Sequence, residues 1–319
     1  MTQIDSNIQR AKEFLLLDEL VAIPTETVYG LAANAFSETA IQKIFELKNR
    51  PRFNPLIVHI ASVDRLKEVA IHISPLMMEL AAAFWPGPLT LLVDKKDTIS
   101  SLVTAGSDRV AVRIPNHPLT LELLKQLPFP VAAPSANPFM SISPTQANHV
   151  KQYFDGKLHY ILDGGICQKG IESTIIGFRD NQAVLYREGS CDLDEIEKIT
   201  GPLVRLDLED SKIEAPGMLK KHYAPQTKLR VTTDIVSEVQ FHKGKKIGLL
   251  TLKPQPSIAA VSVQLSLSEN GDLNQAAKNL YAHLIQLDAL NLDLIITEFM
   301  PETGIGNAIN DKLKRASHP

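Results

Sequence analysis

The sequence predicts an α/β fold with two domains: a larger domain built on a mixed sheet, then a smaller βαβα domain. Along residues 1–202, short apolar β-like runs and helical patterns follow one another without strict alternation, which favours a mixed sheet over a doubly wound one. From residue 229 onward strands and helices alternate, as they do in parallel βαβ units. A length of 319 residues with 44% apolar residues suffices for two hydrophobic cores.

The elements of the first domain, residues 1–202, follow from hydrophobic period and from prolines that end helices. Apolar residues at helical spacing predict helices at residues 4–17, 40–50, 74–88 and 118–127. Short apolar or alternating runs predict strands at residues 21–23, 55–60, 89–95, 109–115, 129–137, 160–165 and 173–178.

Residues 203–228 are predicted to form a linker. They include APGMLKKHYAP, which has neither a helical nor a strand period and carries two prolines and a glycine. The second domain, residues 229–319, has strand patterns at 245–252 and 292–300 and helical patterns at 274–290 and 306–317. The linker composition suggests a lid that lies across a cleft and keeps water from a labile intermediate.

Composition limits the function classes. A net charge of −3 gives no global basic field, so any anion site must be local. Cys167 and Cys191 stand outside any CxxC pair or His cluster, which predicts reduced thiols. The N-terminal residues show no apolar signal core, and no run approaches the roughly 20 apolar residues of a membrane span. We therefore expect a cytoplasmic protein without a membrane segment.

The common nucleotide-binding motifs are absent from the sequence. There is no GxxxxGK[ST], and GIGNAI, which begins at Gly304, lacks the third glycine of the dinucleotide fingerprint. HExxH and GxSxG do not occur either. A nucleotide would have to be bound in another way.

The segment KNRPRFNPLIVHI places three cations, Lys48, Arg50 and Arg52, on a proline-bracketed loop before a predicted strand. Arginine can bind a phosphate through two parallel hydrogen bonds, and the prolines reduce the entropy lost when the loop is fixed. The cations indicate either a solvated loop or a phosphate site. His59, at the end of the strand, is either a hydrogen-bonded core histidine or a ligand contact.

The strand RVAVRIP carries Arg109 and Arg113 four residues apart, so both point to the same face. Two arginines on one face of an apolar strand are costly unless they meet anions, which favours a binding role. Polar groups also follow strands in PTETVYGLAANA, PSANPFMSISPT, GIESTIIGF and YREG. These segments are either ligand contacts or ordinary polar turns, and together they indicate a cleft for a polyanion.

Taken in order, PTETVYGL, KNRP…NPL, VRIP, SAN, SPT and EST resemble the YrdC-type threonylcarbamoyl-AMP synthases over about residues 8–200. APGMLKKHYAP and the last helical segments resemble the longer, two-domain branch of that family. The resemblance implies a YrdC-like twisted mixed sheet with flanking helices and a small Rossmann-like C-terminal domain. It also implies synthesis of L-threonylcarbamoyl-adenylate from L-threonine, bicarbonate and ATP, with release of pyrophosphate.

The same resemblance implies roles for residues of this sequence. The K-x-R pair, Lys48 and Arg50, marks the catalytic core. The residues implied to contact ATP are Arg50, Asn54, Arg109, Ser135, Asn137, Ser143, Arg187 and Tyr223. Those implied to contact L-threonine are Thr27, His59, Arg113, Ala133 through its backbone, and Ser173. Mg²⁺ is expected with ATP, without a dedicated carboxylate cluster. A tRNA-modifying threonylcarbamoyl transferase is expected downstream, for N6-threonylcarbamoyladenosine formation.

Two other functions stay open at this point. The cleft could belong to an RNA-binding module, although the net charge is −3 and there is no aromatic stacking motif. Alternatively, the first domain could belong to a carbamoyl-transfer enzyme, although such proteins carry acylphosphatase or zinc-finger segments that two isolated cysteines cannot build.

Overall fold

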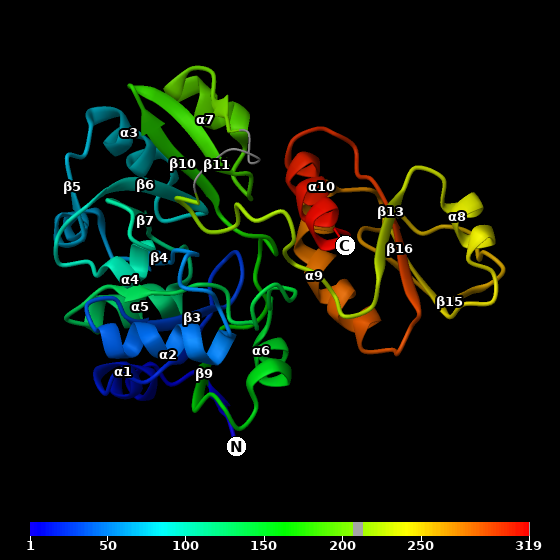
Figure 1. Ribbon diagram of the computed structural model, residues 1–319, viewed down its shortest axis with the longest axis horizontal. Helices are drawn as coiled ribbons and strands as arrows, with labels where there is room; N and C mark the ends of the chain where they lie inside the picture. The colour runs from blue at the N-terminus through cyan, green and yellow to red at the C-terminus, as the bar shows by residue number, and fades with distance from the viewer. Residues whose placement is uncertain (207–212, 319) are drawn as a thin grey trace. The chain divides into compact units, whose positions relative to one another are not determined.

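The computed structural model describes residues 1–206 and 213–318, which form two compact units (Figure 1). The first unit comprises Met1–Phe139, Pro144–Gln168 and Glu172–Leu219. The second comprises Met140–Ser143, Lys169–Ile171 and Lys220–Pro319. Residues 207–212 of the predicted linker lie outside the described residues.

The first unit contains a sheet in the order β1-β9-β2-β3-β8-β4-β7-β6-β10-β11-β12, with β5 paired to β6. Neighbouring strands are both parallel, as in β4 and β7, and antiparallel, as in β3 and β8, so the predicted mixed sheet is confirmed. The strands are β1 (Gln3–Asp5), β2 (Val21–Ile23), β3 (Gly30–Asn34), β4 (Ile57–His59), β5 (Ala70–Ile71), β6 (Leu89–Lys95), β7 (Arg109–Arg113), β8 (Val131–Ala132), β9 (Tyr160–Leu162), β10 (Thr174–Arg179), β11 (Gln182–Arg187) and β12 (Val204–Arg205).

Helices flank this sheet, and their ends follow from capping residues. They are α1 (Ile8–Leu16), α2 (Glu38–Lys48), η1 (Val63–Glu68), α3 (Pro75–Phe84), α4 (Ser101–Thr104), α5 (Pro118–Gln126), α6 (Ala147–Phe154) and α7 (Leu193–Thr200). Helix α2 begins after Ser37, whose side chain accepts from the Ala40 N–H, and ends at Asn49 in the left-handed conformation. That end places Lys48 and Arg50 at the start of the proline-bracketed loop.

The predicted helix over residues 4–17 is too long. Residues Gln3–Asp5 instead form β1, which pairs with β9, and α1 begins after Asn7, whose side chain accepts from the Arg10 N–H. The N-cap preference of Asn therefore overrides the apolar period that extends to Ile4. Strands β3 and β11 and helices α6 and α7 were not predicted, because their apolar residues lie inside polar or glycine-containing segments.

Strand residues alternate between two apolar layers, one on each face of the sheet. Ala22, Val58 and Val112 lie in the core that also includes residues of α2, α3, α4, α6 and α7. Their chain neighbours Ile57 and Ala111 face the opposite layer, with Ala215 and Met218 of the segment that follows residue 212. This alternation is the period of two expected for strands buried on both faces.

The segment 213–219 is thus packed on the first unit. Ala215 and Met218 are buried against strand residues, and Glu214 lies 3.0 Å from the Arg179 guanidinium and accepts from the Tyr186 hydroxyl at 3.1 Å. The start of the predicted linker also has regular structure, since β12 pairs with β11. The linker residues that pack here approach the sheet face that carries Arg109 and Arg113.

The second unit contains four parallel strands in the order β13-β16-β14-β15. Helices α9 and α10 lie on one side of this sheet and α8 lies on the other (Figure 1). The elements are β13 (Leu229–Thr232), α8 (Ile235–Phe241), β14 (Ile247–Thr251), β15 (Val261–Ser266), α9 (Leu273–Asp288), β16 (Leu294–Glu298) and α10 (Ile305–Ala316). The predicted parallel pairing is present, but β13, α8 and β15 were not predicted because these segments are short and partly exposed.

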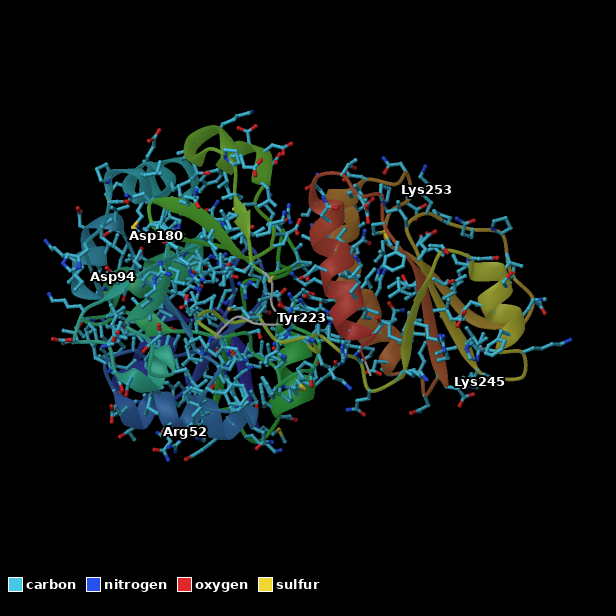
Figure 2. The ribbon with its side chains drawn as sticks, turned by 45° about the horizontal axis from the view of Figure 1, so that its top comes forward. Arg52, Asp94, Asp180, Tyr223, Lys245 and Lys253 are labelled. Carbon is cyan, nitrogen blue, oxygen red and sulfur yellow. The ribbon has the colours of Figure 1, made fainter. Side chains whose placement is uncertain are left out.

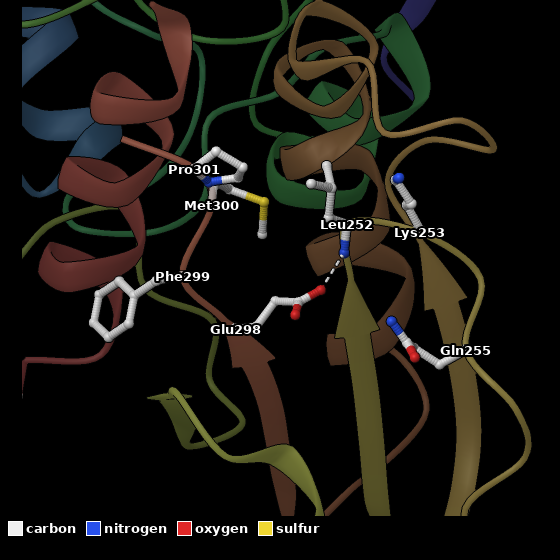
Figure 3. Close-up of a pocket in the computed structure, with 7 residues that line it drawn as sticks. All are labelled: Leu252, Lys253, Gln255, Glu298, Phe299, Met300 and Pro301. Atoms are coloured by element: carbon white, nitrogen blue, oxygen red, sulfur yellow. Dashed lines mark hydrogen bonds between the residues drawn. The ribbon is translucent and has the colours of Figure 1, made fainter. Parts of the chain in front are cut away.

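A shallow hollow of about 400 Å³ lies at the carboxyl ends of β14 and β16 (Figure 3). Lys253 is its cation, and Phe299 and Met300 supply apolar surface. Its carboxylate, Glu298, already accepts from the Leu252 N–H at 2.8 Å, so this group holds the two strand ends together. None of the described helices is long and apolar enough to cross a lipid bilayer.

Replacing Met218 with Ala should lower the free energy of unfolding of the first unit by about 2–4 kcal/mol, because it removes a buried side chain and leaves a cavity. The chain's one tryptophan, Trp85, lies in this unit, so its fluorescence in a denaturant titration reports the change. Ile166→Ala, at a position with 57% exposure, serves as the control and should change stability by less than about 0.5 kcal/mol. Equal effects of the two substitutions would contradict the packing of the segment on the sheet.

Candidate functional site

Lys48, the last residue of α2, is buried and reaches a loop that lies far from it in the sequence. Its Nζ donates to the carbonyls of Ser135 at 2.6 Å and Asn137 at 2.5 Å, and its own carbonyl accepts from the Phe139 N–H at 2.8 Å. Burial, with the charge of Arg50 as a smaller cause, lowers the pKa of this ammonium well below its ordinary value. Lys48 therefore fixes the path of the loop that carries two of the predicted ATP contacts.

Arg50 shapes the proline-bracketed loop from the inside. Its guanidinium donates to the carbonyls of Asn54 at 3.1 Å and Pro55 at 2.7 Å. The Asn54 side chain is buried, yet neither atom of its amide has a hydrogen-bond partner among the residues that the structure describes. Arg52 is exposed at the periphery (Figure 2), so the solvated-loop interpretation applies to Arg52 alone. A buried amide without partners is costly, which points to a ligand at Asn54.

Three of the predicted L-threonine contacts, Thr27, His59 and Arg113, meet at the end of β7. The Arg113 guanidinium donates to Thr27 Oγ1 at 2.9 Å and to the Gly87 carbonyl at 3.1 Å, and lies 2.6 Å from Glu26 Oε1. His59 is paired in register with Arg113 on the neighbouring strand β4. A guanidinium held between a carboxylate and a hydroxyl is fixed in direction, as recognition of a planar carboxylate requires.

His59 is buried and neutral. Burial, with the neighbouring Arg113 charge as a second cause, lowers its pKa to about 3. Its Nδ1 has no hydrogen-bond partner within the described ranges. A hydrogen bond with the Ile57 backbone acts in the opposite direction on the pKa, so a hydrogen-bonded core histidine and a ligand contact both remain interpretations of His59.

Ser173 and Arg187 form a second cluster. Arg187 donates to Ser173 Oγ and to the Ser173 carbonyl, both at 2.9 Å, and Ser173 Oγ lies 2.7 Å from Thr90 Oγ1. A Cβ on Gly189 would lie 2.3 Å from the Ser173 carbonyl carbon, so only glycine allows this close approach. Arg187 also reaches the Pro216 carbonyl at 3.4 Å, which connects the cluster to the segment 213–219.

Arg109 lies on the same face of β7 as Arg113 but has other partners. It donates to the Tyr186 hydroxyl at 2.8 Å and the Phe178 carbonyl at 2.7 Å, and lies 3.6 Å from Glu214. The sequence argument that both arginines must meet anions holds, since each meets a protein carboxylate. In this structure Arg109 helps to fasten the segment 213–219.

The remaining predicted contacts lie in two places. The Ala133 N–H donates to the Ile57 carbonyl at 2.9 Å, so its carbonyl is the backbone group that can serve a ligand. Asn137 is buried on the loop held by Lys48. Ser143 and Tyr223 belong to the second unit.

Sequence reasoning missed one charged member of the site, Glu26. It stands within PTETVYGLAANA, one of the segments in which polar groups follow a predicted strand. In the structure Glu26 is buried, faces Arg113, and accepts from the Asn116 N–H at 3.0 Å. The signal that could have found it is the need of a buried arginine for a nearby anion.

No group of three or more His, Cys, Asp or Glu residues that could hold a metal ion occurs within the described part of the chain. The carboxylates beside the predicted contacts on β7 are Glu26, which is engaged by Arg113, and Glu214, which is engaged by Arg179 and lies near Arg109. The residues present therefore do not fit a protein-held metal centre, and a divalent ion here would need its ligands from a bound substrate and water.

Comparison with known proteins finds matches that cover nearly all of the chain. A family described as "Telomere recombination" matches residues 13–189, and one described as "Threonylcarbamoyl-AMP synthase, C-terminal domain" matches residues 191–318. A Bacillus subtilis protein named threonylcarbamoyl-AMP synthase is 38% identical over 98% of this chain and 93% of its own length. A Pyrococcus abyssi protein of the same name is 40% identical over 97% of this chain and 94% of its own. The crystal structure of P. abyssi Sua5 complexed with L-threonine matches with a TM-score of 0.91 at 37% identity, covering 99% of this chain and 98% of that chain.

The neutral state of His59 predicts a loss of stability in acid. In the unfolded chain its pKa is 6.5, whereas in the folded chain it is about 3, so the unfolded state binds more protons as the pH falls below 6.5. The free energy of unfolding should therefore fall between pH 7.5 and pH 5, with about 2 kcal/mol of that fall due to His59. In denaturant titrations at pH 7.5 and pH 5, the free energy of unfolding of His59→Asn should therefore fall by about 2 kcal/mol less than that of the wild type. An unchanged pH dependence in His59→Asn would contradict the account.

Proposed function

The chain belongs to the threonylcarbamoyl-AMP synthase family, and from that premise we propose that it joins L-threonine, bicarbonate and ATP into L-threonylcarbamoyl-adenylate, releasing pyrophosphate. The product serves the N6-threonylcarbamoyladenosine modification of tRNA, through a downstream threonylcarbamoyl transferase. The observation that carries the proposal is the buried Arg113–Glu26–Thr27 cluster beside neutral His59. It offers an amino-acid carboxylate a directed guanidinium in a site poor in water.

In this proposal Arg113 binds the carboxylate of L-threonine, and Thr27 and Glu26 fix the direction of its guanidinium. His59 contributes a neutral imidazole whose Nδ1 is available to the substrate. The Ala133 carbonyl and the Ser173 hydroxyl complete the L-threonine contacts. A neutral imidazole beside Arg113 adds no second positive charge, so it does not raise the cost of burying the site.

The nucleotide contacts are proposed to come from Arg50, Asn54, Arg109, Ser135, Asn137, Ser143, Arg187 and Tyr223. Lys48 has three N–H donors, and the carbonyls of Ser135 and Asn137 use two of them. The third is available to a phosphate oxygen. We propose that Mg²⁺ arrives on the ATP triphosphate, whose oxygens and water supply its ligands, and that it adds positive charge against the phosphates.

The chemistry then needs positioning more than acid–base groups. The amine of L-threonine and bicarbonate form a carbamate and water, and a carbamate oxygen attacks the α-phosphorus while pyrophosphate leaves. Lys48 and Arg50 stabilise the negative charge that develops on the phosphoryl oxygens. Holding the reactants in line supplies a large share of the rate. The linker 203–228 is proposed to exclude water from the site, which agrees with the packing of Ala215 and Met218 on the first unit.

We place the enzyme in the cytoplasm, in keeping with its two buried cysteines, which are not joined in a disulfide. A role as an RNA-binding module is the alternative. Two cations of the KNRPR segment, Lys48 and Arg50, are buried and engaged by backbone carbonyls, which leaves less basic surface for RNA than the sequence suggested.

Pyrophosphate release from ATP and bicarbonate should require L-threonine, and L-serine should support it poorly. This assay separates the two functions. Release that depends on L-threonine and bicarbonate supports the synthase. Folded protein without such release, but with RNA affinity that falls with salt, would support the RNA-binding module instead.

Replacing Lys48 with Met should lower kcat for pyrophosphate release by about 100-fold or more, because a charge-assisted contact to the developing phosphoryl charge is lost. Because Lys48 is buried and donates to the Asn137 carbonyl, this substitution is also expected to loosen the loop at Asn137. Thermal unfolding of Lys48→Met is therefore measured alongside. Arg52→Gln, at the exposed cation of the same segment, is the matched control and should keep wild-type kcat. Wild-type turnover in folded Lys48→Met would remove Lys48 from the catalytic core.

A further inference from the structure

Tyr223 is held in an unusual conformation by the second unit. It is a buried residue with a φ of 61°, a region that aromatic residues rarely adopt. Its ring lies 5.7 Å from that of Tyr281 on α9, stacked at 26°, and 4.0 Å from that of His222. Tyr223 is labelled in Figure 2. Such a conformation persists only where the surroundings fix it.

Lys312 of α10 adds a charge to this arrangement. Its side chain is buried, its Nζ lies 5.5 Å from the centre of the Tyr223 ring, and it donates to Asp311 Oδ2 at 2.8 Å. Asp311 is shared, because its Oδ1 accepts from Arg315 at 2.8 Å. A cation over an aromatic face attracts it more strongly when both are shielded from water. Lys312 is thus placed to hold the Tyr223 ring in one position.

The backbone around Tyr223 is fastened on both sides. The His222 N–H donates to the Arg315 carbonyl at 3.3 Å, near the end of α10. The Ala224 N–H donates to the Met140 carbonyl at 2.8 Å. Met140 directly follows Phe139, whose N–H donates to the Lys48 carbonyl. The segment 222–224 is therefore held by α10 on one side and by Met140 of the same unit on the other.

From these contacts we infer that Lys312 and Tyr281 are positioning residues of the reaction: they hold Tyr223 and, through the Ala224–Met140 bond, the segment Met140–Ser143. The inference rests on the proposed function, in which Tyr223 and Ser143 contact ATP. It gives the second unit a role in nucleotide binding that needs no ligand site of its own. Neither residue touches substrate in this account, since both act through Tyr223.

A packing role alone would make different predictions. Loss of a core contact lowers stability and affects both substrates alike, whereas loss of a positioning contact weakens ATP binding and spares L-threonine. The chain supplies a matched control on the same helix. Lys314 is exposed and lies 5.7 Å from the Phe299 ring, so Lys314→Met removes a similar cation–aromatic contact away from Tyr223.

The test measures Kd for ATP by calorimetry, and KM for ATP and L-threonine by pyrophosphate release, in the full-length chain. Lys312→Met should raise Kd and KM for ATP by about threefold to tenfold and leave KM for L-threonine within about twofold. Lys312→Arg should restore most of the affinity, and Lys314→Met should match the wild type. Tyr223→Leu should weaken ATP binding as well, and adding Lys312→Met to it should cause no further loss.

Wild-type ATP affinity in Lys312→Met, or a double variant whose loss is the product of the two single losses, would overturn the inference. If Lys312→Met does not fold, Tyr281→Leu takes its place, alone and combined with Tyr223→Leu, and the same ATP affinities decide the outcome. The proposed function is judged separately. A wild type that binds ATP but releases no pyrophosphate with L-threonine contradicts the synthase, while the ATP affinities still decide on Lys312. A wild type that binds no ATP overturns both.

Discussion

The site of the first unit depends on the contact between the Lys48 ammonium and the carbonyls of Ser135 and Asn137. A cation buried at the end of a helix is costly unless it is bound, and two carbonyls bind it. The same contacts fix the path of the loop that carries Ser135 and Asn137, which is not held by a helix or a long strand. In the proposed function the third donor of this ammonium binds a phosphate, so that Lys48 would combine support of the loop with binding of charge.

Other buried charges of the site follow the same rule. Arg113 is matched by Glu26, and Arg50 is satisfied by the carbonyls of Asn54 and Pro55. Each guanidinium is oriented before a substrate arrives, so little reorganisation is needed when negative charge develops. In the proposed function, the polar atoms of Asn54 and His59 that lack partners among the described residues contact the substrates.

Local signals predicted much of the fold. The hydrophobic period and the positions of the prolines were enough to predict α2, α3 and β6, because each has a long run of apolar positions whose ends are marked in the sequence. They failed at β1, where only three residues pair with a distant strand, and at β15, where most residues are only partly buried.

The residues of the candidate site could be listed from the sequence, but the contacts between them could not be predicted. Lys48 and Ser135 are 87 positions apart, and no local pattern joins them. Glu26 was missed for the same reason, since its partner Arg113 is also distant.

The most direct test of the synthase account is detection of its product. The full-length protein is incubated with ATP, L-threonine and ¹³C-labelled bicarbonate, and the mixture is analysed by mass spectrometry. The account predicts an adenylate that carries one labelled carbon and forms only when all three substrates are present. Folded protein that binds ATP and L-threonine but yields no labelled adenylate would contradict it.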